Sequence, residues 1–257
     1  MIAHRPKGLA LYNAPGSTCS QKVRLALAEK GLDWQDCRVD LRANEHLEDW
    51  YLALNPNGVV PTLVHDGRPV IESNVIIEYL EDAHPSVRLR PRDPYDQAMM
   101  RVWIYNSEEI AHPNVNTCSH NPRHAVRHKA KKHSREELEA VAARCPNPSI
   151  ARRFLHRIEH GVTDEEENNA YGELDWMLDQ MEAALARHPW VAGSEYSLGD
   201  IAMAPFINRI EVLKRPEMVG AARRPRLAEW WQRVQARPAF KQAFSFENPD
   251  KSDPLKR

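Results

Sequence analysis

Hydrophobic and polar positions follow two different periods over the first ninety residues of the chain. The run GLALYN (residues 8–13) is short and apolar, as in a strand, and the next segment, SQKVRLALAEKG, spaces its apolar residues as in a helix that Gly31 ends. Asp66-Gly67 lies between two further apolar runs and is the strongest hairpin signal in the chain. The predicted order is a strand at 8–13, a helix at 20–31, a strand at 33–41, a short helix or turn at 45–56, two strands within 59–73 and a helix at 73–85.

The pattern becomes helical from about residue 90 onward. A proline-bearing linker at about 86–96 therefore separates two predicted domains, an α/β domain at 1–85 and an all-α domain at 97–257. The insert from His120 to His160 is basic, because it contains ten Lys or Arg and only four Asp or Glu. Apolar residues three and four apart predict helices within 98–110, 170–188, 197–215 and 226–244.

Composition limits the kinds of partner that the chain can have. The net charge is −1, with 28% charged and 42% hydrophobic residues, so no global field attracts nucleic acid or an anionic membrane. No apolar run approaches the roughly 20 residues that span a bilayer, and the N-terminus lacks a signal-peptide core. We therefore predict a cytoplasmic protein with neither nucleic acid nor membrane as partner. The four cysteines lack CxxC or metal-type spacing, which argues against a disulfide framework and a zinc site.

The block NPNGVVPTL…VIESNVIIEYLED, followed by a helical domain, resembles the glutathione S-transferase family. This resemblance implies a thioredoxin-like first domain, glutathione as cosubstrate and a homodimer. It also implies that Pro61 is cis, that the backbone of Val60 pairs with the cysteinyl part of glutathione, and that His46 touches the glycyl end. Glu72 and Ser73 match the pair that holds the γ-glutamyl end, where a helix start favours a carboxylate and Glu72 accepts the ammonium.

YSLGDIAMAP (residues 196–205) supports the same family in the second domain. Ser197 and Asp200 have the spacing of a capping box, in which the serine caps a backbone N–H and the acid returns the bond. We interpret this box as a folding element and assign it no role in chemistry.

The stretch NAPGSTCSQKVRLALAEKG carries the candidate chemistry. A glutathione thiol must lose its proton to become a nucleophile, and a helix start with a hydroxyl or thiol lowers its pKa. We predict Ser17 as the hydrogen-bond donor to the thiolate, with Thr18 and Cys19 as further glutathione contacts. Two alternatives stay open: Cys19 as an essential thiol, which would make the protein a thiol-disulfide reductase or lyase, and Ser20 as the essential hydroxyl.

The second substrate is expected between that turn and the first long helix of the helical domain. Tyr105, Asn106 and His112 are the polar residues predicted to line its pocket. RPRDPYDQAMMRVW, the basic insert and Arg152-Arg153 resemble the β-aryl-etherase branch, in which the thiolate displaces a phenoxide from the carbon beside a ketone. The predicted substrate is thus a small hydrophobic, aromatic electrophile, and the alternative from another class is a non-catalytic glutathione or ligand carrier.

One row of histidines in the insert has helical spacing. His120, His124 and His128 recur every four residues near Cys118, as metal ligands on one helix face do. No carboxylate ligand set accompanies them, so we favour an exposed basic helix and predict no metal.

Overall fold

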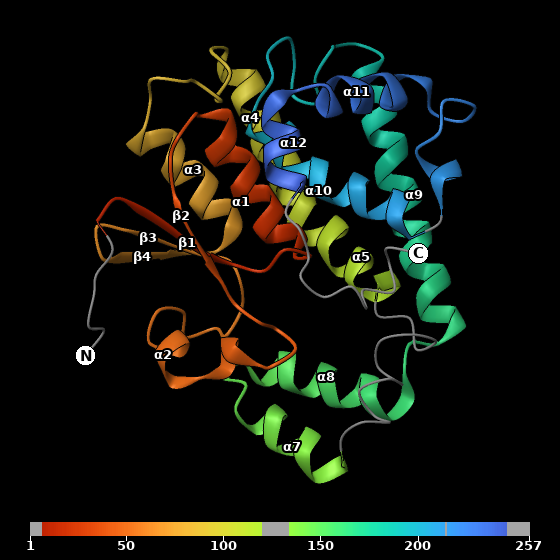
Figure 1. The fold of residues 1–257 in the computed structure, drawn as a ribbon. Coiled ribbons are helices and arrows are strands. Elements are labelled where there is room, and N and C mark those ends of the chain that lie inside the picture. The colour runs from red at the N-terminus through yellow and green to blue at the C-terminus, as the bar shows by residue number, and fades with distance from the viewer. Residues whose placement is uncertain (1–6, 120–133, 214, 246–257) are drawn as a thin grey trace.

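The computed structural model describes residues 7–119, 134–213 and 215–245 of the 257-residue chain (Figure 1). The row His120, His124 and His128 lies outside the described residues. The first half contains a four-stranded sheet in the order β2-β1-β3-β4, in which β1 and β2 are parallel and the other pairs are antiparallel. Its elements are β1 (Leu9–Asn13), α1 (Thr18–Glu29), β2 (Gln35–Arg38), η1 (Glu45–Leu47), α2 (Asp49–Leu52), β3 (Thr62–His65), β4 (Arg68–Ile71) and α3 (Ser73–Ala83).

This order confirms the predicted succession of strands and helices. Helices α1 and α3 cover one side of the sheet and α2 lies on the other (Figure 1). The hairpin between β3 and β4 turns at Asp66-Gly67, where both residues have positive φ, of 50° and 77°, as a tight hairpin turn requires. The apolar core between the sheet and its helices is filled by buried aliphatic side chains that include Leu11, Leu25, Leu63 and Ile76.

The second half is helical, and α10 lies at its centre. Every residue of α10 from Leu198 to Ile207 is buried, because the helix packs against α1, α3, α4 and α5 at once. The segment predicted as one helix at 226–244 is divided in two, since Pro238 begins a new helix. The elements of the second half are α4 (Pro94–Asn106), the π-helical η2 (Ser107–Ala111), α5 (His112–Ser119), α7 (Arg135–Ala143), α8 (Pro148–His160), α9 (Asp164–Leu185), α10 (Leu198–Val212), η3 (Pro216–Met218), α11 (Pro225–Gln235) and α12 (Pro238–Phe244).

The predicted capping box at the start of α10 is present. Asp200 accepts hydrogen bonds from the backbone N–H of Ser197, at 2.9 Å, and of Val191, at 3.1 Å. The hydroxyl of Ser197 also donates to this carboxylate, at 3.1 Å, and the indole Nε1 of Trp230 donates a fourth bond at 2.8 Å, which ties α11 to this helix start. Burial raises the pKa of Asp200 to about 6, against the lowering effect of these donors.

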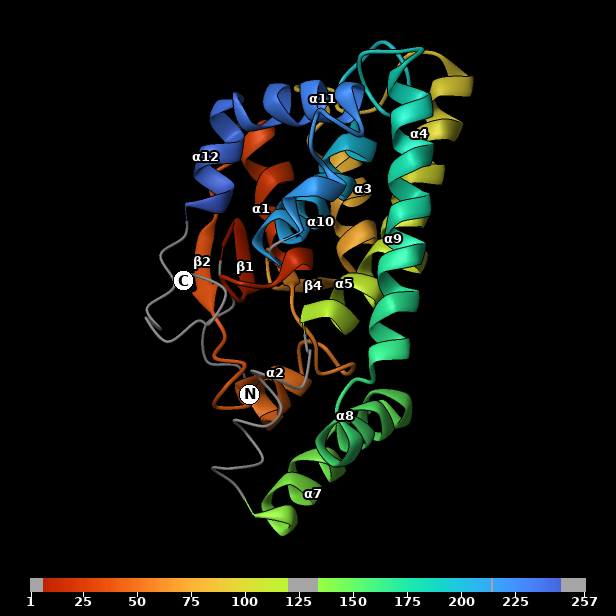
Figure 2. The same cartoon turned by 90° about the vertical axis from the view of Figure 1, so that its right-hand side faces the viewer.

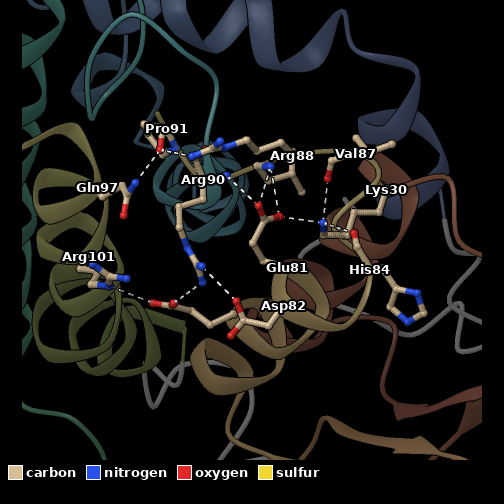
Figure 3. Close-up of polar contacts among 12 residues, drawn as sticks. Lys30, Glu81, Asp82, His84, Val87, Arg88, Arg90, Pro91, Gln97 and Arg101 are labelled. Atoms are coloured by element: carbon tan, nitrogen blue, oxygen red, sulfur yellow. Dashed lines mark hydrogen bonds and ion pairs between the residues drawn. The ribbon is translucent and has the colours of Figure 1, made fainter. Parts of the chain in front are cut away.

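The junction between the halves is built around a buried ion pair. Lys30 Nζ lies 2.7 Å from a carboxylate oxygen of Glu81, and it also donates to the carbonyl oxygens of His84 and Val87 (Figure 3). Glu81 accepts from the backbone N–H groups of Leu89 and Arg90, so one carboxylate fixes the path of the chain after α3. No described helix has both the length and the apolar character needed to cross a membrane.

Helices α7 and α8 form an arm at one end of the molecule, below α2 in Figure 2. The side chain of Arg144, after α7, donates to the carbonyl oxygen of Leu47 at 2.8 Å and so ties this arm to the first half. The structure leaves every side chain of α8 at least partly exposed, although one face of the helix is apolar. Ile150 and Phe154 of that face line a cavity that residues of the first half also line.

Candidate active site

The turn before α1 is held in place by buried charge. Arg24 is fully buried and donates to the side chain of Asn13 and to the carbonyl oxygens of Ala14, Pro15 and Ala243. This network fixes the polypeptide at the point where β1 ends and α1 begins.

Ser17 is the N-cap of α1. Its Oγ accepts a hydrogen bond from the backbone N–H of Ser20 at 3.2 Å. A serine hydroxyl that accepts one bond still has its own hydrogen to donate. Ser20, in contrast, is fully buried, and its Oγ accepts from the backbone N–H of Ala14 at 3.3 Å. Ser17 therefore faces solvent-accessible space and Ser20 faces the turn.

A cavity of about 710 Å³ opens over this helix start and is walled by both halves of the molecule. The first half contributes the α1 start, the loop before β3 and the α3 start, and the second half contributes η2, α5 and the α7–α8 arm. Eight of the residues predicted from the sequence to form the site line it: Ser17, Cys19, His46, Val60, Pro61, Glu72, Ser73 and His112.

The side of the cavity that the first half supplies has the predicted backbone. The Val60-Pro61 peptide bond is cis. The preceding loop is fixed because Tyr51 Oη and Asn55 Nδ2 both donate to the carbonyl oxygen of Val59. Glu72 has a φ of 67°, unusual for a residue with a side chain, and its exposed carboxylate accepts from Asn57 at 2.9 Å.

Next to these residues at the cavity wall, Cys19 and His112 approach each other from opposite halves of the chain. Cys19 is 8% exposed, in the first turn of α1, and its Sγ lies 3.9 Å from Nε2 of His112. Nδ1 of the same ring lies 2.9 Å from a carboxylate oxygen of Glu108, one helical turn earlier. The thiol, the imidazole and the carboxylate thus form a compact cluster at the cavity wall.

The electrostatics of this cluster stabilise negative charge on the thiol and positive charge on the imidazole. Burial disfavours charge on Cys19, but the bond to His112 and the nearby charge of Lys22 outweigh it, so the pKa of the thiol lies below its ordinary value. The bonds to Cys19 and Glu108 raise the pKa of His112 to about 10. The bond to His112 lowers the pKa of Glu108.

Lys22 supplies a buried positive charge beneath the site. Its Nζ donates to Asn74 at 2.6 Å, to Ser73 at 3.2 Å and to Ser107 at 3.3 Å, and so joins α1 to α3 and to η2. The ammonium also lies 5.4 Å from the ring centroid of Phe206. Burial lowers the pKa of Lys22 even though Cys19, Glu108 and Glu72 are nearby.

Comparison with known proteins decides the family. The family models for the N-terminal and C-terminal domains of glutathione S-transferases match residues 16–83 and 149–238. The chain belongs to the glutathione S-transferase family. It is accordingly a glutathione-dependent enzyme with a thioredoxin-like first half and a helical second half, as the sequence predicted.

Several relatives of this transferase align over nearly its whole length. Protein LigF of Sphingobium sp. (strain NBRC 103272 / SYK-6) is 34% identical, over 97% of each chain. Tetrachloro-p-hydroquinone reductive dehalogenase of Sphingobium chlorophenolicum is 33% identical, over 93% of this chain and 97% of that protein. The crystal structure of the beta-etherase LigF superposes with a TM-score of 0.83 at 32% identity and covers 93% of this chain and 99% of LigF.

Three residues that the sequence predicted for the transferase site do not line the cavity. Thr18, Tyr105 and Asn106 are absent from its walls. The reason for Tyr105 is geometric: Ser107 points to Lys22 on α1, and a residue two positions earlier on a helix points roughly 200° away. Tyr105 is in fact 63% exposed. Of the three residues predicted for the electrophile pocket, His112 alone lines this cavity.

Glu108 and Lys22 are two charged residues of the cluster that sequence reasoning missed. Both carried a readable signal, because Glu108 stands four residues before His112 and Lys22 stands three residues after Cys19, so each pair shares a helix face. The signal was not decisive, since nothing in the local sequence indicates that these two faces meet.

The same residues contain ligand types for a metal ion. Atoms of Cys19, Glu108 and His112 lie within 4.8 Å of one another. However, the carboxylate bonds to Nδ1 and the thiol faces Nε2, and an ion binds only one nitrogen of a ring. An ion at either nitrogen would replace a hydrogen bond that these side chains make with one another. We therefore describe the cluster as hydrogen-bonded side chains and assign it no metal.

Proposed function

We propose that this transferase uses the glutathione thiolate to displace an aromatic leaving group, and that β-aryl ether cleavage is its reaction. The observation that carries the proposal is the shared cavity, which joins the predicted glutathione residues to a polar wall supplied by the helical half. Two relatives support it, because one is named a beta-etherase and the other a dehalogenase of a chlorinated hydroquinone. In the reaction a sulfur–carbon bond forms beside a ketone while the carbon–oxygen bond breaks and a phenoxide leaves.

The hydrogen-bond donors and acceptors around Val60, Glu72 and Ser73 suit glutathione. The carboxylate of Glu72 can accept the γ-glutamyl ammonium, and the start of α3 at Ser73 suits the neighbouring carboxylate. Buried Lys22, which donates to Ser73, adds positive charge behind that carboxylate. The backbone of Val60 beside the cis bond and the side chain of His46 complete the proposed contacts with the peptide.

Ser17 is the proposed donor to the glutathione sulfur. Its hydroxyl lines the cavity and already accepts from Ser20, so its hydrogen is directed elsewhere and can stabilise a thiolate. The positive end of α1 acts on the same sulfur. The role of Ser17 as a cap and its role as a donor are therefore compatible.

The test is direct. The protein is incubated with glutathione and a ketone bearing a β-aryl ether, and the release of phenol and the formation of the glutathione thioether are measured together. The proposal expects both products in equal amounts. Tight binding of glutathione without any product, across aryl ethers and aryl halides, would identify a carrier instead.

A second candidate function is favoured by the contact between Cys19 and His112. A thiolate stabilised in this way can attack the sulfur–sulfur bond of a glutathione mixed disulfide, taking the glutathionyl group and releasing the other thiolate, which His112 protonates. A second glutathione thiolate then attacks the mixed disulfide on Cys19 and leaves as glutathione disulfide. Cys19→Ser separates the candidates, because it abolishes disulfide reduction if this function holds and leaves ether cleavage in place if the first one does.

We also propose a homodimer that forms through α3 and α4. These helices lie side by side, since Asn74 of α3 donates to the carbonyl oxygen of Ile104 in α4. Val75, Val102 and Tyr105 are 55%, 45% and 63% exposed on them, which leaves apolar surface for a partner. Light scattering should give the mass of a dimer, and Val102→Glu should give a monomer. Val87→Glu, an exposed valine outside both helices, is the matched control.

The proposed reaction also supports the predicted cytoplasmic location. It consumes reduced glutathione, and the cytosol is the compartment in which glutathione keeps thiols reduced. All four cysteines of the chain are free thiols in the structure. Fractionation of cells should find the protein with the cytosolic enzymes.

A further inference from the structure

The imidazole of His112 is held in one orientation at the cavity wall. Its Nδ1 is bonded to Glu108 at 2.9 Å, and its ring lies 6.2 Å from the ring of Phe206, tilted by 43°. Its other nitrogen, Nε2, faces the thiol of Cys19 and the cavity. A ring fixed on one nitrogen by a carboxylate presents the opposite N–H to whatever enters the cavity.

The charges around His112 keep this ring protonated. Cys19 on α1 and Glu108 on η2 contact it directly, and the pKa of the ring is raised to about 10. Lys22 on α1 and Glu72 at the start of α3 are the further charged groups coupled to this cluster. A phenol has an ordinary pKa of about 10, so a proton moves between such a ring and a phenoxide at little cost.

Other proton donors of the cavity are less well placed. The ammonium of Lys22 is buried and donates to three acceptors. The hydroxyl of Ser17 is assigned to the thiolate, and the imidazole of His46, which also lines the cavity, is assigned to the glycyl end of glutathione. Arg153 lies on the exposed side of α8 and does not give up its proton in proteins. Tyr105 lies outside the cavity.

We propose that His112 is a further catalytic residue, which donates its Nε2 proton to the phenoxide as the ether bond breaks, and that Glu108 is the residue that positions it. This inference rests on the proposed ether cleavage. The electron pair of the broken carbon–oxygen bond goes to oxygen, and the proton of Nε2 completes the phenol. The thiol proton of the next glutathione restores the imidazolium, so each turnover converts one glutathione and one ether into a thioether and a phenol.

The decisive test varies the leaving group. A proton donor matters for a poor leaving group and little for a good one, so His112→Gln is compared with the wild type on two matched ethers, one of methoxyphenol and one of 4-nitrophenol. We expect kcat/KM to fall about 100-fold or more for the methoxyphenol ether and less than about 10-fold for the nitrophenol ether. His188→Gln, an exposed histidine in the loop after α9, is the control and should change neither rate.

The outcomes separate this inference from the function on which it rests. Equal losses on the two ethers, with an unchanged melting temperature, would show that His112 only supports the structure or Cys19. Cleavage of neither ether by the wild type would overturn the proposed function and the role of His112 with it. The wild type also tests the inference without any substitution, because a solvent deuterium isotope effect should appear with the methoxyphenol ether and be absent with the nitrophenol ether.

The role of Glu108 has its own readout, which requires no substrate. Glu108→Gln leaves a neutral acceptor but removes the negative charge that helps to raise the pKa of His112, so the ring should titrate at lower pH when followed by NMR. Loss of activity with an unchanged titration would overturn the positioning role, and Glu108→Asp should restore part of the shift.

Discussion

Helices α1 and α10 both begin with a serine cap, at Ser17 and Ser197, but the two helix starts have opposite surroundings. At α10 the neighbouring Asp200 is fully buried, and four donors from three segments bind its carboxylate. At α1 the cap lines a cavity, and the neighbouring thiol of Cys19 has a partner from the other half of the chain. A completely bonded and sealed cap holds a fold together, whereas a cap that keeps a donor toward a cavity is available for chemistry.

The largest effect is expected at the sealed helix start. Asp200→Ala leaves the N–H groups of Val191, Ser197 and Trp230 buried without their acceptor, at a cost of about 1–3 kcal/mol for each stranded donor. We expect the free energy of unfolding to fall by at least about 3 kcal/mol in urea titrations. Glu195→Ala, exposed next to the same helix start, should be neutral. A similar loss of unfolding free energy in both variants would show that the bonds to Asp200 add no particular stability.

At the open helix start the same kind of change should act on catalysis. Ser17→Ala removes the proposed donor to the thiolate, so kcat/KM should fall about 100-fold, as when one preorganised donor is removed from other active sites. The ultraviolet absorbance of bound glutathione across pH should show the thiol pKa returning toward its free value. Loss of the cap itself costs only about 1 kcal/mol of stability. An unchanged thiol pKa would reduce Ser17 to a helix cap.

Cys19→Ser should change how the rate of ether cleavage depends on pH. The bond to Cys19 is the largest cause of the raised pKa of His112, so its loss lowers that pKa. A proton donor works only below its pKa, and the alkaline fall in the rate of ether cleavage should therefore move to lower pH, by about one unit or more. The pH profile of kcat/KM measures this. An unmoved alkaline limb would mean that the thiol and the ring do not share a proton in the working enzyme.

The smallest kinetic effect is expected at Tyr105. Because its side chain is outside the cavity, Tyr105→Ala should leave kcat/KM within about two-fold of the wild type, as surface substitutions usually do. The same variant should weaken the dimer proposed on α3 and α4, measured by sedimentation at falling protein concentration. A large kinetic loss would return Tyr105 to the electrophile pocket.

The first half of the fold was predictable because each of its signals is local. The turn at Asp66-Gly67, the helix period of α1 and the cis bond before Pro61 depend on neighbouring residues or on a motif in one stretch of chain. The capping box of α10 was predictable for the same reason, although the bond that Asp200 accepts from Trp230 was not.

The electrophile side of the site was less predictable, because it depends on how two helices meet. His112 was chosen for its polarity together with Tyr105 and Asn106, and only His112 lines the cavity. The π-helical segment η2 begins directly after Asn106, and Ser107 turns toward α1 at that point. A periodic extrapolation along α4 cannot show which of its residues the first half will face.

The thiol of Cys19 and the ring of His112 are 93 positions apart in the chain and belong to different halves, so the acidity of this thiol is a property of their docking. An alkylating reagent reacts with thiolate, and the pH at which Cys19 begins to be labelled therefore reports whether the halves are in contact. Cys118 serves as a reference thiol that stays unlabelled in the folded protein, because burial raises its pKa to about 12. Labelling of both sites in increasing urea would show whether the two halves separate before either one unfolds.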